Sequence, residues 1–213
     1  AGSGIDFSPA VLLSGIVLYT FFSEATGDGV DSLVRNESMV RRVAFPRLVI
    51  PLAVTLTAGF NLVMNLIAAV FFMAIAGVGV HWTWIEAPLI LLVLFIFAQG
   101  AVMLLSVQFV RFRDVQPIWQ VVLQALFYLT PILYPIEVIE QRNPDLAQLA
   151  MCNPLAAINQ QFRHAVIDPT APSAAEAIGG TLLLAIPLGI IAGVFVLGLW
   201  VFSRRAPAIA EEL

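Results

Sequence analysis

Few side chains in this sequence are of the types that carry catalysis or bind metals. His81 and His164 are the only histidines, and they do not stand at the spacing of a metal pair, such as i and i+4. Cys152 is the single cysteine, so the chain offers no internal disulfide and no cysteine metal cluster. No nucleophile stands beside a base in a recognisable pattern. We therefore expect no metal site and no enzyme active site in this chain.

The basic residues exclude ATP hydrolysis by this chain. All 10 of them are Arg, and Lys is absent. A Walker A phosphate loop needs a Lys at the β- and γ-phosphates, and Schiff-base catalysis also needs a Lys amine. If the protein uses ATP, a separate subunit must bind the nucleotide and its Mg²⁺. This chain is expected to need no cofactor of its own.

Three glutamines favour a different kind of chemistry, the recognition of sugars. Gln116, Gln120 and Gln124 recur every four residues, so a helix carries them as one polar stripe. The aromatic residues interleaved with this stripe, or following it, are Trp119, Phe127, Tyr128 and Tyr134. Rings stack on the C–H faces of sugars while amides bond their hydroxyls, so this set is a candidate channel lining. Helix packing with an aromatic belt at the membrane interfaces is the alternative explanation.

The elements that position these residues are membrane-spanning helices. Apolar residues make up 60% of the chain and charged residues 11%, against roughly 45–50% and 25% in soluble domains. The mean hydropathy is +0.95. Five apolar stretches are close to the ~20 residues that cross a bilayer or exceed them: residues 8–25, 48–80, 87–110, 115–136 and 177–202. The sequence predicts an all-α membrane protein in which residues 1–213 form a single transmembrane domain.

Arginine placement gives the orientation of these spans. If each stretch crosses once, three connecting regions lie on one side of the membrane. Their arginines are Arg35, Arg41, Arg42, Arg47, Arg111, Arg113, Arg204 and Arg205. The opposite side holds Arg142 and Arg163. Basic loops stay in the cytoplasm, so the arginine-rich side is cytoplasmic, and this agreement supports five crossings.

A short cytoplasmic helix is expected over residues 31–44. Gly27 and Gly29 are expected to end the preceding span, and Asp31 to cap the new helix. The polar face of this helix is formed by residues at helical spacing, Asp31, Arg35, Ser38 and Arg42. The segment is therefore expected to lie at the cytoplasmic surface.

The outer segment, residues 137–176, is longer than a turn. The pairs Asn143-Pro144 and Asn153-Pro154 each fit an Asn N-cap followed by Pro in the first helical turn. An apolar stripe at helical spacing follows the second pair, at Leu155, Ile158, Phe162 and Val166. We therefore expect two short, half-buried helices at the outer face.

The interior of the membrane is expected to lack charge. No ionisable residue stands near the centre of a predicted span, and Glu24 is placed at a cytoplasmic end. This disfavours ion-coupled transport, which usually needs an intramembrane carboxylate or His. The neutral polar residues of the spans are Asn61, Asn65, Gln99, Gln108, Gln120 and Gln124. They serve either interhelical hydrogen bonds or a polar path.

A pair of small residues in the last span predicts close helix packing. Gly189 and Gly193 form a GxxxG pattern, which lets two helix backbones approach each other. Contact within the chain is favoured over a contact between two copies.

Three stretches of the sequence resemble permease subunits of polysaccharide-exporting ABC transporters. The run from Val40 to Arg47, continuing to Pro51, resembles the signature that follows the coupling helix in that family. Residues 127–135, which read FYLTPILYP, resemble the end of its fifth span. Residues 153–163 resemble its outer gate helix. The three stretches occur in the family's order and are spread across nearly the whole chain.

The resemblance implies a more detailed architecture. Such permeases have six spans and act as homodimers with two ATPase subunits, so this chain would hold spans two to six. Residues 31–44 would be the coupling helix, with ATPase-coupling residues Asp31, Arg35, Asn36, Glu37, Ser38, Arg41 and Arg42. Residues 137–176 would form the outer gate, including Asn153, Pro154, Phe162 and Arg163.

The resemblance also implies a function. It is the ATP-driven export of a lipid-linked polysaccharide, such as O-antigen, teichoic acid or galactan, across the bacterial cytoplasmic (inner) membrane. The implied partners are a nucleotide-binding ATPase subunit, a second permease chain and the lipid-linked glycan, and no nucleic acid is expected. Export of a drug or a small lipid by an ABC exporter is an alternative. Secondary transport is a further one.

Overall fold

The structure is a computed structural model that describes residues 9–38, 47–75, 79, 81–132, 134 and 136–212. These residues form helices joined by turns and short irregular segments, with no strand among them. The helices long and apolar enough to cross a membrane are α1 (Pro9–Val30), α4 (Val49–Ile75), η1 (Trp82–Glu86) continuing into α5 (Ala87–Arg111), and α11 (Ala185–Glu212). The all-α membrane fold expected from the composition is confirmed.

The fourth predicted span is shorter than expected. Helix α6 covers Val115–Leu129, which is 15 residues or about 22 Å at 1.5 Å per residue. The apolar stretch predicted an end at Ile136. The backbone of Thr130 is extended (φ −87°, ψ 128°), because a residue before proline is disfavoured in the helical region. Pro131 therefore ends α6 early, and the chain continues in turns.

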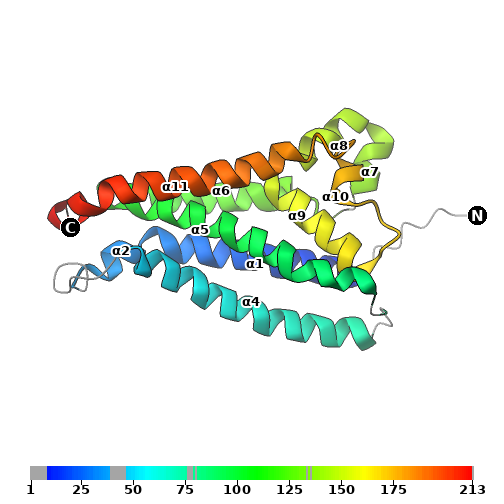
Figure 1. Ribbon diagram of the computed structural model, residues 1–213, viewed down its shortest axis with the longest axis horizontal. Helices are drawn as coiled ribbons and strands as arrows, with labels where there is room; N and C mark the ends of the chain where they lie inside the picture. Colours follow the sequence, from blue (N-terminus) through cyan, green and yellow to red (C-terminus); the bar gives the residue numbers. More distant parts are fainter. Residues whose placement is uncertain are drawn as a thin grey trace, which may run out of the picture.

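The long helices run side by side in alternating directions (Figure 1). Helix α1 packs against α4, α5 and α6, and α5 packs along both α1 and α11. Helix α2 (Ser32–Arg35), the α5–α6 turn and the C-terminal end lie at one end of the bundle, and α7, α8 and α10 lie at the other (Figure 1). The described arginines of the predicted cytoplasmic set therefore share one end, as the charge pattern predicted.

The contact between α1 and α5 is made by stacked aromatic rings. Phe21 stacks on Phe95 with ring centroids 6.4 Å apart, and Phe22 stacks on Phe97 at 5.0 Å. Phe21 and Phe22 are fully buried between the helices. Such offset stacking adds about 0.5–1.5 kcal/mol per pair beyond the area that it buries. This contact forms the centre of the core.

The contact between α5 and α11 is made through glycines. A Cβ atom on Gly100 would lie 2.6 Å from the Cα of Phe195, and one on Gly198 would collide with the carbonyl oxygen of Gly100. Gly189 and Gly193, in contrast, have open space where a Cβ would lie. The predicted within-chain contact of the GxxxG pair is therefore wrong. That pair lies on an exposed face of α11, and the backbones approach closely at Gly100 and Gly198 instead.

We expect Gly100→Ala and Gly198→Ala each to destabilise the protein by about 1–3 kcal/mol, because the added methyl meets backbone that cannot move aside. Gly193→Ala is the matched control in the same helix. It should be neutral or stabilising by up to about 1 kcal/mol, because alanine is the better helix former. Thermal unfolding in detergent measures all three. Equal melting temperatures for Gly198→Ala and Gly193→Ala would contradict the assigned contact.

Candidate transport surface and coupling segment

The predicted coupling segment begins at Asp31 as expected, but the span before it ends later than expected. Helix α1 continues through Gly27 and Gly29 to Val30, so these glycines do not break the span. Gly29 instead permits close packing, since a Cβ there would lie 2.7 Å from Val102 Cγ1. Asp31 stands at the N-cap position of α2, but its side chain accepts no capping hydrogen bond. It forms an ion pair with Arg35 at 3.2 Å, one turn on, as the shared helical face predicted.

The rest of this segment is held by local hydrogen bonds. Arg35 Nη2 also donates to the carbonyl oxygen of Asp28 at 3.0 Å, and Asn36 Nδ2 donates to that of Ser32 at 2.8 Å. Glu37 is half-buried and Ser38 is exposed. Within the described residues the predicted helix over 31–44 consists of the short α2, a turn at Asn36, and the helical residues Glu37 and Ser38. Residues 39–44 lie outside the described residues, and the predicted coupling residues Arg41 and Arg42 are among them.

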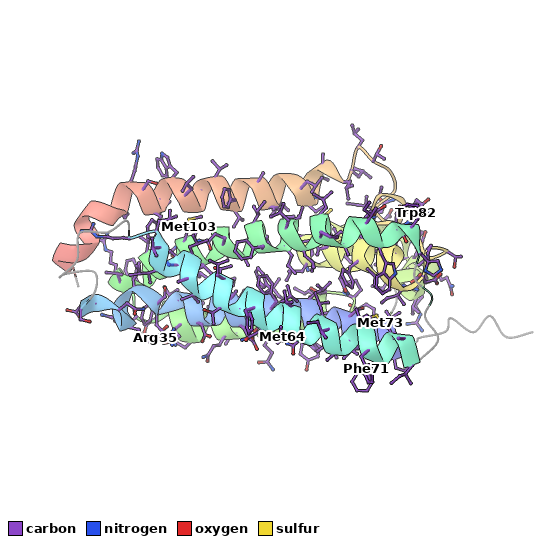
Figure 2. All side chains as sticks on the ribbon, turned by 60° about the horizontal axis from the view of Figure 1, so that its bottom comes forward. Arg35, Met64, Phe71, Met73, Trp82 and Met103 are labelled. Atoms are coloured by element: carbon purple, nitrogen blue, oxygen red, sulfur yellow. The ribbon has the colours of Figure 1, made fainter. Side chains whose placement is uncertain are left out.

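A buried leucine ties this segment to the membrane helices. Leu33 is fully buried in a cluster contributed by α4, α5 and α11, whose members are Ile50, Met103, Val107, Val110 and Phe202. Figure 2 shows Arg35 and Met103 at the same end of the bundle, and Trp82 at the other. A displacement of α2 must therefore displace the ends of three helices or break this cluster, because packed interiors deform little.

Trp119 and the glutamines of α6 lie on different faces of the helix. Trp119 donates from Nε1 to Thr26 Oγ1 at 3.0 Å and packs on α1, and Leu123 is buried beside it. Gln120 and Gln124 are exposed, and Gln116 is half-buried. Trp119 therefore faces α1, whereas the glutamine stripe lies on a different side of α6.

The outer end of α6 carries the other aromatic residues of the predicted lining. Phe127 is half-buried. Its ring meets the rings of Tyr19 and Tyr128 edge-on, with ring centroids 5.1 Å and 5.6 Å apart. Tyr128 is 61% exposed. Tyr134 donates from its hydroxyl to the carbonyl oxygen of Tyr128 at 3.2 Å. Phe127 and Tyr128 share with the glutamines the edge of α6 away from Leu126. Tyr134 follows α6 and lines a pocket together with Leu126 and Ile190 of α11.

A carboxylate lies deeper in the membrane than the sequence indicated. Glu24 was placed at a cytoplasmic end, but α1 runs six residues further, to Val30. Its Oε2 accepts a hydrogen bond from Asn61 Nδ2 at 3.5 Å, and Asn61 is one residue from the midpoint of the 27-residue α4. The expected position of Glu24 at the cytoplasmic end of the first span is therefore wrong. Placing the end of the first span at residue 25 caused the error.

A second polar group lies at the midpoint of α5. Gln99 is only 5% exposed, and neither its Oε1 nor its Nε2 has a hydrogen-bond partner among the described residues. Leaving such a group unpaired costs about 1–3 kcal/mol in a protein interior. Gln99 therefore neither makes an interhelical hydrogen bond within the described residues nor lines an exposed polar path, the two roles expected for neutral polar residues in the spans.

Polar residues of α1, α4 and α6 define a polar face on these three neighbouring helices, and Gln99 of α5 is not part of it. Helix α1 buries Leu18, Ala25 and Gly29 in the bundle, which leaves the side with Thr20 and Glu24 half-buried. Asn61 borders this side from α4. The edge of α6 that carries Gln120 and Gln124 borders it from the other direction, beside Tyr19. The polar face is defined here as Thr20, Glu24, Asn61, Gln120 and Gln124.

The outer segment begins with two helices that asparagines and prolines delimit. Helix α7 covers Ile136–Arg142, and α8 covers Pro144–Met151. Asn143 caps α8, because its side-chain oxygen accepts from the amides of Asp145 and Leu146 at 3.1 and 3.3 Å. This predicted cap is confirmed. Helix α7 was not predicted, because its start was counted as part of the preceding span.

The next helix of the outer segment, α9 (Pro154–Phe162), carries the predicted gate residues. Asn153 caps it by accepting from the amide of Leu155 at 3.1 Å, which confirms the second predicted cap. Pro154 is buried in the first turn, and Phe162 is buried in the main core. The apolar stripe predicted for this helix is buried as expected: Leu155, Ile158, Phe162 and Val166.

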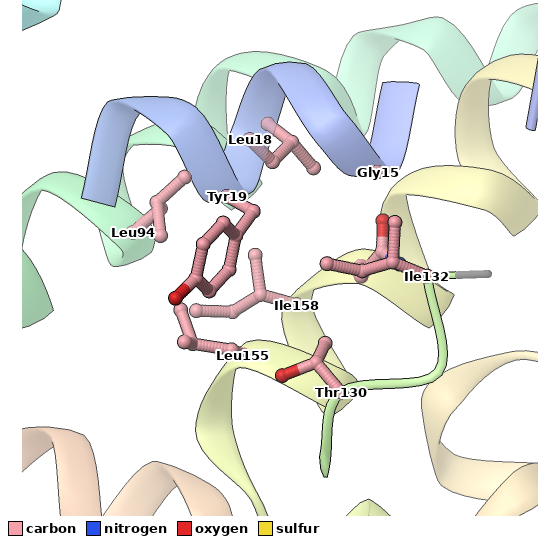
Figure 3. Close-up of a pocket in the computed structure, with 9 residues that line it drawn as sticks. Gly15, Leu18, Tyr19, Leu94, Thr130, Ile132, Leu155 and Ile158 are labelled. Carbon is pink, nitrogen blue, oxygen red and sulfur yellow. The ribbon is translucent and has the colours of Figure 1, made fainter. Parts of the chain in front are cut away.

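The end of α6 is joined tightly to α9 and α1. Asn153 Nδ2 donates to Thr130 Oγ1 at 3.1 Å, and Asn159 Nδ2 donates to the carbonyl oxygen of Pro131 at 3.4 Å. The gap between these elements is about 10 Å³, at the lower limit for one water molecule (Figure 3). Gly15 makes this fit possible, since a Cβ there would lie 3.0 Å from Ile132.

The chain then continues in a π-helical turn, Arg163–Ile167, and in α10 (Ala174–Ala177). Arg163 Nη1 forms an ion pair with Glu137 of α7 at 3.0 Å, and both side chains are largely buried. Thr83 and Trp84 of η1 donate side-chain hydrogen bonds to the carbonyl oxygens of residues 165 and 166, at 2.6 and 3.0 Å. The start of α5 is thereby fastened to the outer segment.

One carboxyl group of this outer segment has a lowered pKa. Asp168 accepts hydrogen bonds from the hydroxyl and the amide of Thr170 at 2.6 and 3.0 Å. Chiefly the side-chain hydrogen bond from Thr170, and to a smaller extent the positive charge of Arg163, hold the pKa of Asp168 below its usual value. The Asp168 carboxylate therefore stays ionised to a lower pH than an ordinary aspartate does.

These helices and this polar face define a multi-pass, all-α membrane protein. The chain belongs to the ABC-2 type transporter family, whose model matches residues 3–167.

Three curated relatives have related names. The O-antigen export system permease protein RfbA of Myxococcus xanthus is 25% identical over 209 residues, which cover 96% of this chain and 76% of that protein. Two O-antigen export system permease proteins RfbA of Klebsiella pneumoniae are 26% and 25% identical over 161 and 155 residues. Those matches cover 75% and 72% of this chain and 61% and 58% of the relatives.

The ion pair of the outer segment can be tested by a double-mutant cycle. We expect Arg163→Met and Glu137→Gln each to destabilise the protein, because each leaves a largely buried charge without its partner. The double variant should lose less stability than the two single variants lose in sum, and the difference should be about 0.5–3 kcal/mol. Thermal unfolding measures the cycle, with Arg205→Met at the exposed opposite end as control. Additive effects would show that the two side chains do not interact.

Proposed function

We propose that this chain is the membrane-spanning subunit of an ATP-driven exporter that moves a lipid-linked polysaccharide out across the bacterial cytoplasmic membrane. The polar face of α1, α4 and α6 carries this proposal. Amide and carboxylate groups at that depth suit a substrate rich in hydroxyl groups, because each hydroxyl both donates and accepts hydrogen bonds. The relatives named O-antigen export permeases support the same substrate class.

The energy for transport comes from another subunit in this proposal. The sequence has no Lys for a phosphate-binding loop, so a separate nucleotide-binding subunit holds ATP and Mg²⁺. The ion-paired Asp31 and Arg35 are exposed enough to contact that subunit, with side chains 25% and 54% accessible. Leu33 joins them to α4, α5 and α11. A movement of the ATPase is transmitted to the membrane helices through this contact.

A second copy of the chain completes the path in this proposal. Beyond the polar face, α6 exposes apolar side chains such as Ile118, Val121 and Leu129. Two polar faces brought together form a channel in which Gln116, Gln120 and Gln124 bond the sugar hydroxyls while Phe127 and Tyr128 stack on the rings. Trp119 acts by holding α6 on α1. The outer segment, with Asn153, Pro154, Phe162 and Arg163, closes this channel at the outer face.

The sugar-binding part of the proposal predicts a loss of export without a loss of assembly. We expect the double variant Gln120→Ala/Gln124→Ala to slow glycan export at least about five-fold, the effect of losing one hydrogen bond of about 1 kcal/mol. Ile118→Ala, in the same helix away from the glutamines, is the control. Export is measured with the permease–ATPase complex in proteoliposomes, using a labelled lipid-linked glycan.

Three results of that assay would contradict the proposal. Unchanged export in the double variant would remove the glutamines from the path. Export of a drug or a short-chain lipid, with no export of the glycan, would favour the alternative substrate class. Transport that continues without ATP, driven by an ion gradient through Glu24, would favour a secondary transporter.

The coupling part of the proposal predicts a loss of ATPase binding. We expect the double reversal Arg35→Glu/Arg42→Glu to abolish co-purification of the ATPase subunit, because it replaces two cations of the contact by anions. The double reversal Arg204→Glu/Arg205→Glu makes the same change of charge at the same end of the bundle and should retain binding. A folded Arg35→Glu/Arg42→Glu variant that binds the ATPase as the wild type does would refute the assignment of residues 31–44.

A further inference from the structure

A large apolar pocket lies beside the outer segment, apart from the polar face. It measures about 910 Å³, is open on one side, and is lined by α6, α7, α8, the start of α9 and Ile190 of α11. Its apolar walls include Leu126, Val138, Leu146, Leu149 and Ile190. Pockets that hold small organic ligands usually measure roughly 300–1,000 Å³, so this one has room for a long hydrocarbon chain.

The pocket is accessible at the depth where lipid chains lie. Leu146 and Leu149 of α8 are 53% and 68% exposed, and Leu129 at the end of α6 is 63% exposed. The pocket runs from the α7–α8 junction to Leu126, inside the apolar α6, and to Ile190, five residues into α11. The pocket therefore extends from the outer segment along about one helical turn of α6 and of α11, two apolar helices of the bundle.

One cation lies at the outer rim of this pocket. Arg142, the last residue of α7, lines the pocket with its neighbour Asn143. Arg142 is exposed, and no ion pair involves it among the described side chains. Arg163, the other arginine of the outer segment, is already paired with Glu137. Arg142 is thus the arginine of this segment that is left to bind an anion from outside.

The charge decides what the pocket selects. A hydrocarbon chain gains little by leaving lipid for an apolar protein pocket, because lipid tails are as apolar as leucine. Selectivity must then come from the polar end of the ligand. A guanidinium bonds a phosphate through two parallel N–H donors, and such charge-assisted hydrogen bonds are about twice as strong as neutral ones.

We propose that this pocket binds the hydrocarbon chain of a lipid phosphate, with the Arg142 guanidinium on the phosphate. The inference rests on the proposed function, because the ligand is the lipid end of the exported glycan conjugate. The polar face then carries the sugars while the chain stays in this pocket, on the other edge of α6. Leu126 and Gln124 lie on these two opposite edges, which separates the lipid and the sugar by the width of one helix.

The single cysteine of the chain reports occupancy directly. Cys152 lines the same pocket and is half-buried, and its thiol donates weakly to the carbonyl oxygen of Gln148 at 3.4 Å. The permease–ATPase complex is placed in phosphatidylcholine nanodiscs with polyprenyl phosphate or with the uncharged polyprenol. The rate of Cys152 alkylation by a maleimide is followed by peptide mass spectrometry.

Polyprenyl phosphate is expected to slow alkylation at least five-fold, and polyprenol to have less than half that effect. Arg142→Ala should remove the difference between the two lipids. Gln141→Ala, a change at the adjacent exposed residue outside the pocket, should preserve it. A pocket-filling change, Leu146→Trp, should abolish protection by either lipid, whereas Leu182→Trp, outside the pocket, should preserve it.

Three outcomes would overturn the inference. The first is an alkylation rate that neither lipid changes. The second is equal protection by both lipids, which would mean that any hydrocarbon fills the pocket. The third is full protection before lipid is added, which would mean that protein, such as a second copy of the chain, covers it.

Glycan export by the same complexes keeps the two hypotheses apart. Export without lipid protection of Cys152 would refute the pocket and leave the proposed function standing. Lipid protection of Cys152 without glycan export would refute the proposed function and leave the pocket standing.

Discussion

Close packing of α5 against α1 and α11 is the interaction on which the rest of the structure depends. In a bilayer the helices gain little from burying apolar surface, because the surrounding lipid is equally apolar, so shape and close contact decide which helices associate. Helix α5 has a different surface for each neighbour. Phe95 and Phe97 stack on α1, and Gly100 lets the backbone of α11 approach. The bundle is therefore held by complementarity of shape along one helix.

Helix α5 also joins the two ends that the proposed transport cycle uses. At its cytoplasmic end, Met103, Val107 and Val110 enclose Leu33 of the coupling segment. At its outer end, the preceding turn η1 is fastened to the π-helical turn by hydrogen bonds from Thr83 and Trp84. Because packed helices shift as units rather than deform, a push on Leu33 reaches the outer segment as a movement of α5. The predicted coupling segment and the predicted gate are thus in contact with the same helix.

The sequence predicted those features that local chemistry controls. Long apolar stretches located the spans, and Asn-Pro pairs located the starts of α8 and α9, because a capping side chain and a proline act within one turn. The chemistry of Pro131 marked the true end of α6, but the apolar residues that follow it extended the predicted span. Helix α7 was missed for the same reason.

Features that depend on packing between helices were not predictable in this way. Gly27 and Gly29 have the composition of a helix end, yet α1 continues because Gly29 packs against Val102. The glycines that approach another helix closely, Gly100 and Gly198, do not form a GxxxG pattern within one helix, so only their contact across two helices reveals them. The burial of Leu33 likewise needs three helices that are distant in sequence.

The position of Glu24 changes the reasoning about function as well as the fold. An empty membrane interior was the ground for disfavouring ion-coupled transport, and Glu24 beside Asn61 removes that ground. Membership of the ABC-2 type family now supports ATP-driven transport instead. A carboxylate at this depth is costly unless it faces water or polar partners, and one amide at 3.5 Å is a weak partner. The face that carries Glu24 is therefore poorly suited to lipid. In the proposed function, a hydrated, hydroxyl-rich substrate between two such faces would supply the polar surroundings that the side chain requires.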